Sequence, residues 1–199
     1  FEFSEHVRTM KNFGTIKMIL IALILSVLSA LPGQTEINLL KNDALIEAAK
    51  AGDLRVGQDL LHRKHNIEGR EQDGRTPLFF AASRGSEDFV ELLVKHNAKI
   101  DALDNLGNSP IYYAAAGNHV GVVEILLESG ANLDSQNRRG LTPLMIAASE
   151  GNLSTVQVLI DGKADPTLTD FTGRTAWEWA HRSNHRGILR YMRSVGINR

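Results

Sequence analysis

The sequence predicts an all-α repeat solenoid, a stack of about five helix pairs with projecting β-hairpin loops between successive pairs. Two observations lead to this fold class. A set of marker residues recurs every 33 positions, and each recurring unit holds two short segments whose apolar residues follow helical spacing. A single helix pair cannot bury its apolar side alone, so neighbouring units are expected to stack.

The 33-residue period is clearest in a Thr-Pro step and in the small residues around it. A glycine lies two positions before each step, and an alanine pair follows it. The step itself appears as Thr76-Pro77, Ser109-Pro110 and Thr142-Pro143, and then as Thr175-Ala176. A closing residue recurs as Gly52, Gly85, Asn118, Gly151 and Asn184. Asparagine is the best replacement for glycine where the backbone must be left-handed, so all five positions predict the same turn.

Each unit is expected to form two helices. The first runs over about 77–84, with Thr76 as its N-cap and Pro77 in the first helical position, where a missing N–H costs nothing. Gly85 ends this helix and Ser86 caps the next one. The second helix covers about 87–95 and turns four apolar residues toward the core: Phe89, Val90, Leu92 and Leu93.

Both ends of the stack are expected to be caps, because a polar outer face keeps a solenoid soluble. The second helix of the first unit, about 54–63, presents polar residues outward: Arg55, Gln58, Asp59 and His62. The last unit contains two tryptophans and a final basic helix: Trp177, Trp179, Arg186, Arg190 and Arg193. A contact of this basic helix with an acidic partner or a membrane remains an alternative to a solvated end.

A period of 33 with Asp-x-x-Gly-x-Thr-Pro-Leu near the start of each unit resembles the ankyrin repeat. The resemblance covers residues 42–199, with units at about 42–72, 73–105, 106–138, 139–171 and 172–199. In many ankyrin repeats a histidine follows Thr-Pro-Leu and hydrogen-bonds adjacent hairpins. Here that position holds Phe79, Tyr112, Met145 and Glu178. We therefore expect the units to be joined more by packing than by hydrogen bonds, with modest softness between them.

Residues 10–33 predict a secretory signal peptide. Two lysines precede an apolar core of 14 residues, 18–31, which spans only about 21 Å as a helix and is short for a membrane span. Residues 34–41 would be a short linker, and residues 1–9 are interpreted as vector-derived or upstream sequence. The expected location is a bacterial periplasm. The alternatives are an extracellular protein, an uncleaved membrane anchor or a buried core helix.

Composition and motifs favour a binding protein over an enzyme. The chain is 43% hydrophobic and 23% charged, as in globular proteins, and its net charge of −1 gives no reason to expect nucleic acid as a partner. It has no cysteine, which excludes disulfides and thiolate ligands. His181 and His185 are spaced like a metal-binding pair, yet they are expected on different helices, and His62 and His65 have no third ligand.

We therefore predict no catalytic residues, no metal site and no cofactor; a hydrolase or metal enzyme that uses the histidines is the alternative from another class. The carboxylates recur at turn positions of the repeat, where capping and turn hydrogen bonds are their simplest role. They are Asp73, Asp101, Asp104, Asp134, Asp165 and Asp170.

The resemblance also implies a partner-binding surface, because ankyrin proteins usually meet partners through hairpin tips and the exposed side of the first helices. Carried over by register, the predicted residues are Asp73, Arg75, Ser83, Arg84, Asn105, Leu106, Asn108, Arg138, Arg139, Leu141, Glu150, Phe171, Thr172, Arg174 and Arg182. The arginines form a broken basic row, and the set includes three apolar side chains. Arginine and aromatic residues dominate interface energetics, so we expect a protein partner with an acidic surface.

A competing interpretation is that nearby turn acids neutralise these arginines: Glu71, Asp104 and Asp170. The mature chain is expected to be a monomer without a membrane span. The resemblance to small periplasmic ankyrin proteins implies a non-catalytic interaction module. Some proteins of that type are linked with oxidative-stress defence beside catalases and others resemble toxin-immunity proteins; a secreted effector is the remaining alternative.

Overall fold

The computed structural model describes residues 44–198, so the predicted signal peptide, the linker and the leading residues lie outside the described residues. The described part begins with a helix over residues 44–51. The helices that follow are α3 (Leu54–His62), α4 (Pro77–Arg84), α5 (Glu87–Lys95), α6 (Pro110–Ala116), α7 (Val120–Glu128), α8 (Pro143–Glu150), α9 (Leu153–Asp161), α10 (Ala176–Arg182) and α11 (Arg186–Ser194).

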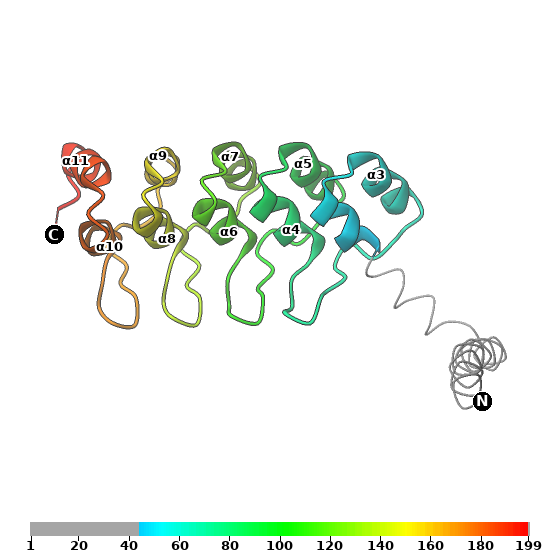
Figure 1. The fold of residues 1–199 in the computed structure, drawn as a ribbon, viewed down its shortest axis with the longest axis horizontal. Coiled ribbons are helices and arrows are strands. Elements are labelled where there is room, and N and C mark those ends of the chain that lie inside the picture. Colours follow the sequence, from blue (N-terminus) through cyan, green and yellow to red (C-terminus); the bar gives the residue numbers. More distant parts are fainter. Residues whose placement is uncertain (1–43, 199) are drawn as a thin grey trace, which may run out of the picture. The chain divides into compact units, whose positions relative to one another are not determined.

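These helices form two rows, as Figure 1 shows. The first row contains α4, α6, α8 and α10, and the second contains α3, α5, α7, α9 and α11. Each helix of the first row packs against its neighbours in that row and against the second helix of its own unit. Loops project from the first row, on the side away from the second. The predicted all-α repeat solenoid is confirmed.

The helix boundaries follow the sequence signals closely. Helices α4 and α5 have the predicted bounds, and α3 ends one residue earlier than predicted. Thr76 is the N-cap of α4, but its side chain makes no capping hydrogen bond. The equivalent Thr142 hydroxyl accepts one from the Met145 N–H at 3.3 Å, and Thr175 forms a capping box with Glu178. The Thr-Pro step therefore predicted the position of the N-cap correctly, but the capping hydrogen bond forms only in some units.

Two asparagines stand where other units have a glycine at the end of the first helix. Asn118 and Asn184 have φ angles of 56° and 59°, in the left-handed region, as predicted. Gly85 has the same turn in its unit, with φ of 75°. The chain therefore reverses in the same way after the first helix of these three units.

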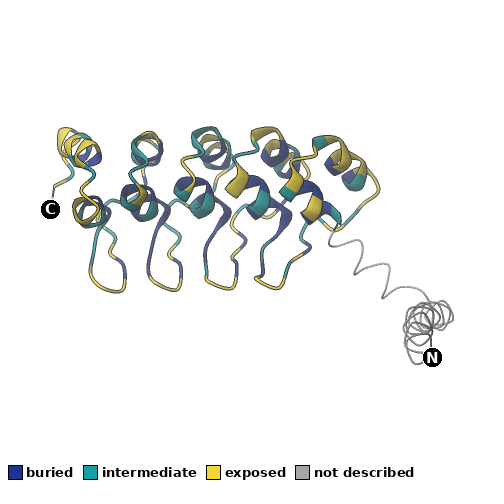
Figure 2. Cartoon of the chain, viewed as in Figure 1, coloured by how far each residue is buried: buried dark blue, intermediate teal, exposed yellow. Residues whose placement is uncertain are grey.

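The core lies between the two rows and between neighbouring helices of the first row (Figure 2). Alanine pairs fill the closest contacts and are 0% exposed: Ala81, Ala82, Ala114, Ala115, Ala147 and Ala148. Larger residues of the second helices, such as Phe89 and Leu126, pack behind them. The outward residues predicted for both end caps are exposed.

The projecting loops are tight turns rather than β-hairpins, and no strand occurs among residues 44–198. Each turn is closed by a backbone bond such as Asp104 N–H to Asn108 O, at 3.0 Å. Neighbouring tips are joined by one backbone–backbone bond each, for example Asn105 N–H to Asp73 O at 2.8 Å. One bond per neighbour is too few to form a strand ladder.

A row of carbonyl oxygens at the ends of the first helices joins each unit to the next, and we call it the carbonyl row. It consists of Lys50, Ser83, Ala116 and Ser149, which are 33 residues apart. Each carbonyl accepts a hydrogen bond from a side chain of the following unit. The donors are Arg84 at 3.1 Å and His119, Asn152 and His185 at 2.9 Å.

A second set of cross-unit bonds uses carboxylates. Asp101 and Asp134 accept backbone N–H groups of the next unit at 2.9 and 2.8 Å, and Glu68 does the same for Lys99 at 2.7 Å. The side chains of Asp101 and Asp134 thus bond between units, whereas a turn or capping role was predicted for them. The units are thus joined by hydrogen bonds as well as by packing, and side chains other than the missing histidine form these bonds; the softness expected between units stays a prediction.

Candidate binding surface

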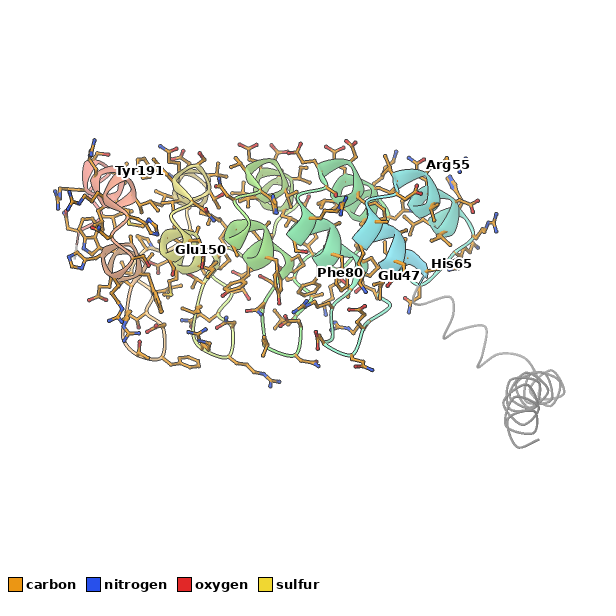
Figure 3. The ribbon with its side chains drawn as sticks, viewed as in Figure 1. Glu47, Arg55, His65, Phe80, Glu150 and Tyr191 are labelled. Carbon is orange, nitrogen blue, oxygen red and sulfur yellow. The ribbon has the colours of Figure 1, made fainter. Side chains whose placement is uncertain are left out.

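Most of the predicted surface residues are exposed. Figure 3 places Phe80 and Glu150 on the first helix row, from which the tips project. The apolar tip residues Leu106 and Phe171 are 60% and 73% exposed. The other exposed members of the predicted set are Asp73, Ser83, Arg84, Asn105, Arg138, Arg139, Glu150, Thr172 and Arg182.

Two predicted surface residues are buried, which corrects their assignment. Asn108 is 5% exposed and Leu141 is 4% exposed. They share a register with Arg75 and Arg174, which are half-buried. This register directly follows the tip glycine, where the chain turns back toward the stack, so its side chains lie between loops. Asn108 is therefore a structural residue, and Leu141 is packed in the stack except for the small part of its surface that lines a depression on the first helices.

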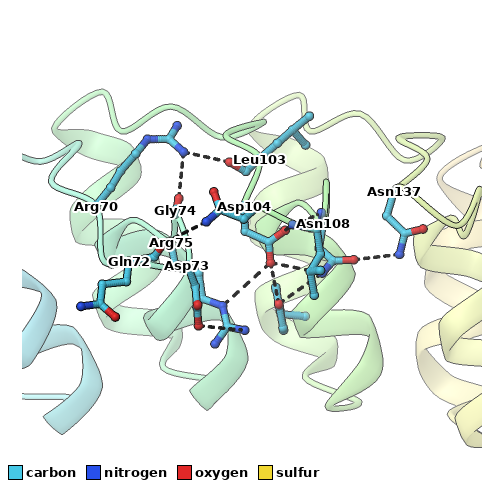
Figure 4. Close-up of polar contacts among 12 residues, drawn as sticks. Arg70, Gln72, Asp73, Gly74, Arg75, Leu103, Asp104, Asn108 and Asn137 are labelled. Atoms are coloured by element: carbon cyan, nitrogen blue, oxygen red, sulfur yellow. Dashed lines mark hydrogen bonds and ion pairs between the residues drawn. The ribbon is translucent and has the colours of Figure 1, made fainter.

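The buried carboxylate of Asp104 organises the second tip (Figure 4). Its Oδ1 accepts the N–H groups of Leu106 and Asn108 at 2.9 and 2.8 Å. Its Oδ2 accepts the Tyr113 hydroxyl at 2.7 Å and the Asn108 amide at 3.1 Å. Burial and the bond to Asp104 raise the pKa of the Tyr113 hydroxyl. Asn137 donates to Asn108 Oδ1 at 2.8 Å, so the network extends to the third tip.

Arg75 belongs to this same cluster and is only partly available. Its guanidinium lies over the Tyr113 ring, 5.0 Å from the centroid. Its Nε is 3.8 Å from Asp104 Oδ2, and one terminal nitrogen is 3.9 Å from Asp73 Oδ2. For Arg75, the competing interpretation of local neutralisation is correct. Arg84 is exposed, but its guanidinium is engaged by the carbonyl row.

Asp170 holds the fourth tip by the same two backbone bonds as Asp104 and by a bond from a threonine hydroxyl. Its Oδ1 accepts the N–H and the hydroxyl of Thr172, at 2.8 and 2.6 Å, and the N–H of Arg174 at 2.9 Å. Burial would raise the pKa of this carboxyl, but the hydrogen bonds outweigh burial and lower the pKa overall. Asn137 accepts the equivalent two backbone bonds at the third tip, at 2.8 and 3.0 Å. Asp170 thus stabilises a turn.

The arginines of the last two tips differ from Arg75. All five ion pairs among residues 44–198 involve residues between Glu47 and Asp104. No carboxylate of that part of the chain pairs with the four arginines Arg138, Arg139, Arg174 and Arg182. None of these four arginines is therefore neutralised by an ion pair within the described residues, although the charge of Arg174 helps to lower the pKa of the nearby Asp170 carboxyl. Only Arg174 has an aromatic contact, over Trp179 with its guanidinium carbon 5.5 Å from the ring centroid.

A row of large side chains on the first helices was missed by sequence reasoning. Phe80, Tyr113, Ile146 and Trp179 are 33 residues apart and are all half-buried. A depression of about 160 Å³ lies beside the last two. Its lining includes Tyr112, Arg139, Ile146, Glu150 and Trp179. The signal was present in the sequence, since each of these row residues lies three positions after the residue that begins its helix.

The histidines considered as metal ligands are separated by the fold. His181 lies on α10, whereas His185 is the N-cap of α11 and bonds to Ser149 O. Within residues 44–198, no three His, Cys, Asp or Glu side chains are grouped so that they could hold a metal ion. No helix in the same part is long and apolar enough to cross a membrane.

Comparison with protein families gives a match over most of the described chain. Residues 45–137 and 129–198 each match a family model described as "Ankyrin repeats (3 copies)". No curated protein sequence matches the chain. The matched stretches span the helix pairs, the carbonyl row and the tips.

Proposed function

Because the chain belongs to the ankyrin-repeat family, whose repeats indicate a protein–protein interaction module, we propose that it binds an acidic protein surface through its tips and first helices, without catalysis of its own. The observation that carries this proposal is the set of four arginines on the third tip, the fourth tip and α10 that lack an ion pair within the described residues. An interface that supplies carboxylates would give these cations the charge-assisted partners that the fold does not provide.

The exposed apolar residues of the tips support the same surface. Phe171 is 73% exposed although the tip needs only its backbone, whose N–H donates to Arg139 O at 3.2 Å. Leu106 is 60% exposed, and its carbonyl accepts the N–H of Arg138 at 3.0 Å. Neither side chain is required by the turn. Aromatic and arginine side chains together are typical of residues that dominate interface energetics.

The proposal is tested by capturing a partner on the immobilised full chain from an extract of the source cells. We expect the variant R138E/R139E to lose that partner, because both side chains are exposed and two charges are reversed at one tip. The matched control is R186E/R190E, which reverses two exposed charges on α11. Retention of the partner by R138E/R139E, with circular dichroism unchanged, would contradict the proposed surface.

We further propose that the protein is exported to a periplasm, on the basis of the basic and apolar residues at 10–33. This location is tested by fractionating source cells and probing for the chain with an antibody. Appearance in the osmotic-shock fraction, at a mass reduced by the signal peptide, is the expected result. Appearance in the culture supernatant would favour a secreted effector, and full-length protein in the membrane fraction would favour an uncleaved anchor.

A further inference from the structure

We propose that the occupant of this surface is an extended acidic peptide segment, held by the last two tips, with an apolar side chain seated beside Trp179. The inference rests on the proposed function and narrows it to one half of the surface and one kind of ligand. Three features of the described residues support it: the uneven distribution of ion pairs, the depression beside Trp179 and the spacing between units.

The ion pairs divide the surface into two halves. In the first half, Lys50 pairs with Glu47 and Glu71, and Arg75 lies near Asp73 and Asp104. These cations are already partnered within the fold. A carboxylate ligand therefore gains most at the second half, where no guanidinium group forms an ion pair with a described carboxylate.

Two arginines of the second half, Arg139 and Arg174, lie at a depression whose lining is partly apolar. Arg139 and Trp179 both line the depression of about 160 Å³, together with Tyr112 and Ile146. The Arg174 guanidinium lies over the Trp179 ring, so a cation and an aromatic face adjoin at its edge. Both tyrosine and tryptophan here are half-buried, which leaves part of each ring available to an apolar side chain.

One carboxylate, Glu150, also lines this depression and is exposed. It would repel an acidic residue placed directly beside it. The segment should therefore present its apolar residue at the depression and its acidic residues toward the tips, where Arg138, Arg139 and Arg174 lie.

The spacing of the stack favours an extended chain as the ligand. Neighbouring packed helices are separated by roughly 8–10 Å, and an extended chain advances about 3.3 Å per residue. Acidic residues about three positions apart would then meet arginines of successive units. An α-helix advances only about 1.5 Å per residue and would bring the same charges too close together.

The test is a selection from a library of random peptides about 12 residues long, roughly 40 Å when extended, on the immobilised full chain. We expect enrichment of Asp or Glu about three positions apart around one apolar residue. The enriched peptide, made with a fluorescent label, should bind about tenfold more weakly to R139E/R174E. Binding to R186E/R190E should stay within about twofold, because that variant changes the same charge on α11.

A second readout locates the apolar residue. Trp177 is buried, so a change in intrinsic tryptophan fluorescence on titration with the unlabelled peptide should come from the half-buried Trp179. The same peptide with Gln in place of Glu should produce no change at equal concentration. If the peptide binds with full affinity but the tryptophan fluorescence does not change, its apolar residue does not lie beside Trp179.

Other outcomes would overturn the inference as a whole. The inference fails if the selection enriches basic or uncharged peptides. It also fails if R139E/R174E and R186E/R190E lose peptide affinity equally, or if the chain binds only vesicles of phosphatidylglycerol. If no acidic peptide is selected but a protein partner is still lost in R138E/R139E, the inference fails and the proposed function stands. If the partner is retained in R138E/R139E, the proposed function fails as well.

Discussion

Replacing Asp104 with alanine is expected to lower the free energy of unfolding by roughly 3 to 5 kcal/mol. The Asp104 side chain is 1% exposed and accepts four hydrogen bonds, from two backbone N–H groups, the Asn108 amide and the Tyr113 hydroxyl. Alanine leaves these donors without an acceptor in a region that water reaches poorly. It also removes the carboxylate that lies beside the Arg75 guanidinium.

This loss is measured by urea unfolding followed by far-UV circular dichroism, with two companion variants. D73A is the control, because Asp73 belongs to the first tip and its side chain is 69% exposed; it should cost less than about 1 kcal/mol. D104N should fall between the two, since Asn137 accepts the same two backbone bonds at the third tip. A D104A protein as stable as D73A would show that the cluster contributes little.

Replacing Asn152 with alanine is expected to cost about 2 kcal/mol, at about 1 kcal/mol for each hydrogen bond removed. The Asn152 amide donates to the carbonyls of Ala115 and Ala116, both at 2.9 Å, and so joins the second-last unit to the one before it. These carbonyls belong to the last turn of α6, where Ala115 O also accepts a long bond from the Asn118 N–H, at 3.4 Å. The effect should appear as a lower urea midpoint with an unchanged slope.

Histidine provides the matched variant at this position. His119 and His185 occupy the same register in the neighbouring units and bond to the same carbonyl row at 2.9 Å. N152H should therefore restore much of the stability that N152A loses, whereas S154A, at an exposed position of α9, should leave the midpoint unchanged. If N152H is no more stable than N152A, the bond to the carbonyl row is not the source of the loss.

The fold was largely predictable because its signals are local. A Thr-Pro step, an alanine pair and a left-handed residue determine one helix and its end, and α4 has the bounds predicted from them. Asn118 illustrates the same point, since its register with Gly85 and its residue type together indicated the left-handed turn that the structure contains. These features depend on residues only a few positions apart, and the repeat shows each signal several times.

The candidate site was less predictable because exposure depends on how a loop lies against its neighbours. Leu141 was expected at a tip, yet the residue after the tip glycine turns inward and is buried. Asn108 was also predicted at the surface and is buried for the same reason. The row that contains Phe80 and Trp179 was overlooked, although its period is visible once one of these residues is known to face the surface.

The sequence by itself determined the repeat, the helix pairs, their turns and the polar ends, because each follows from backbone preferences within about ten residues. Only the tertiary structure decided which arginines form an ion pair with a carboxylate and which do not. Arg75 and Arg139 look equivalent in the sequence, but the first lies 3.8 Å from the Asp104 carboxylate of the next tip, and the second forms no ion pair among the described residues. Charge pairing across a stack depends on side chains about 30 residues apart, which meet only when the units pack.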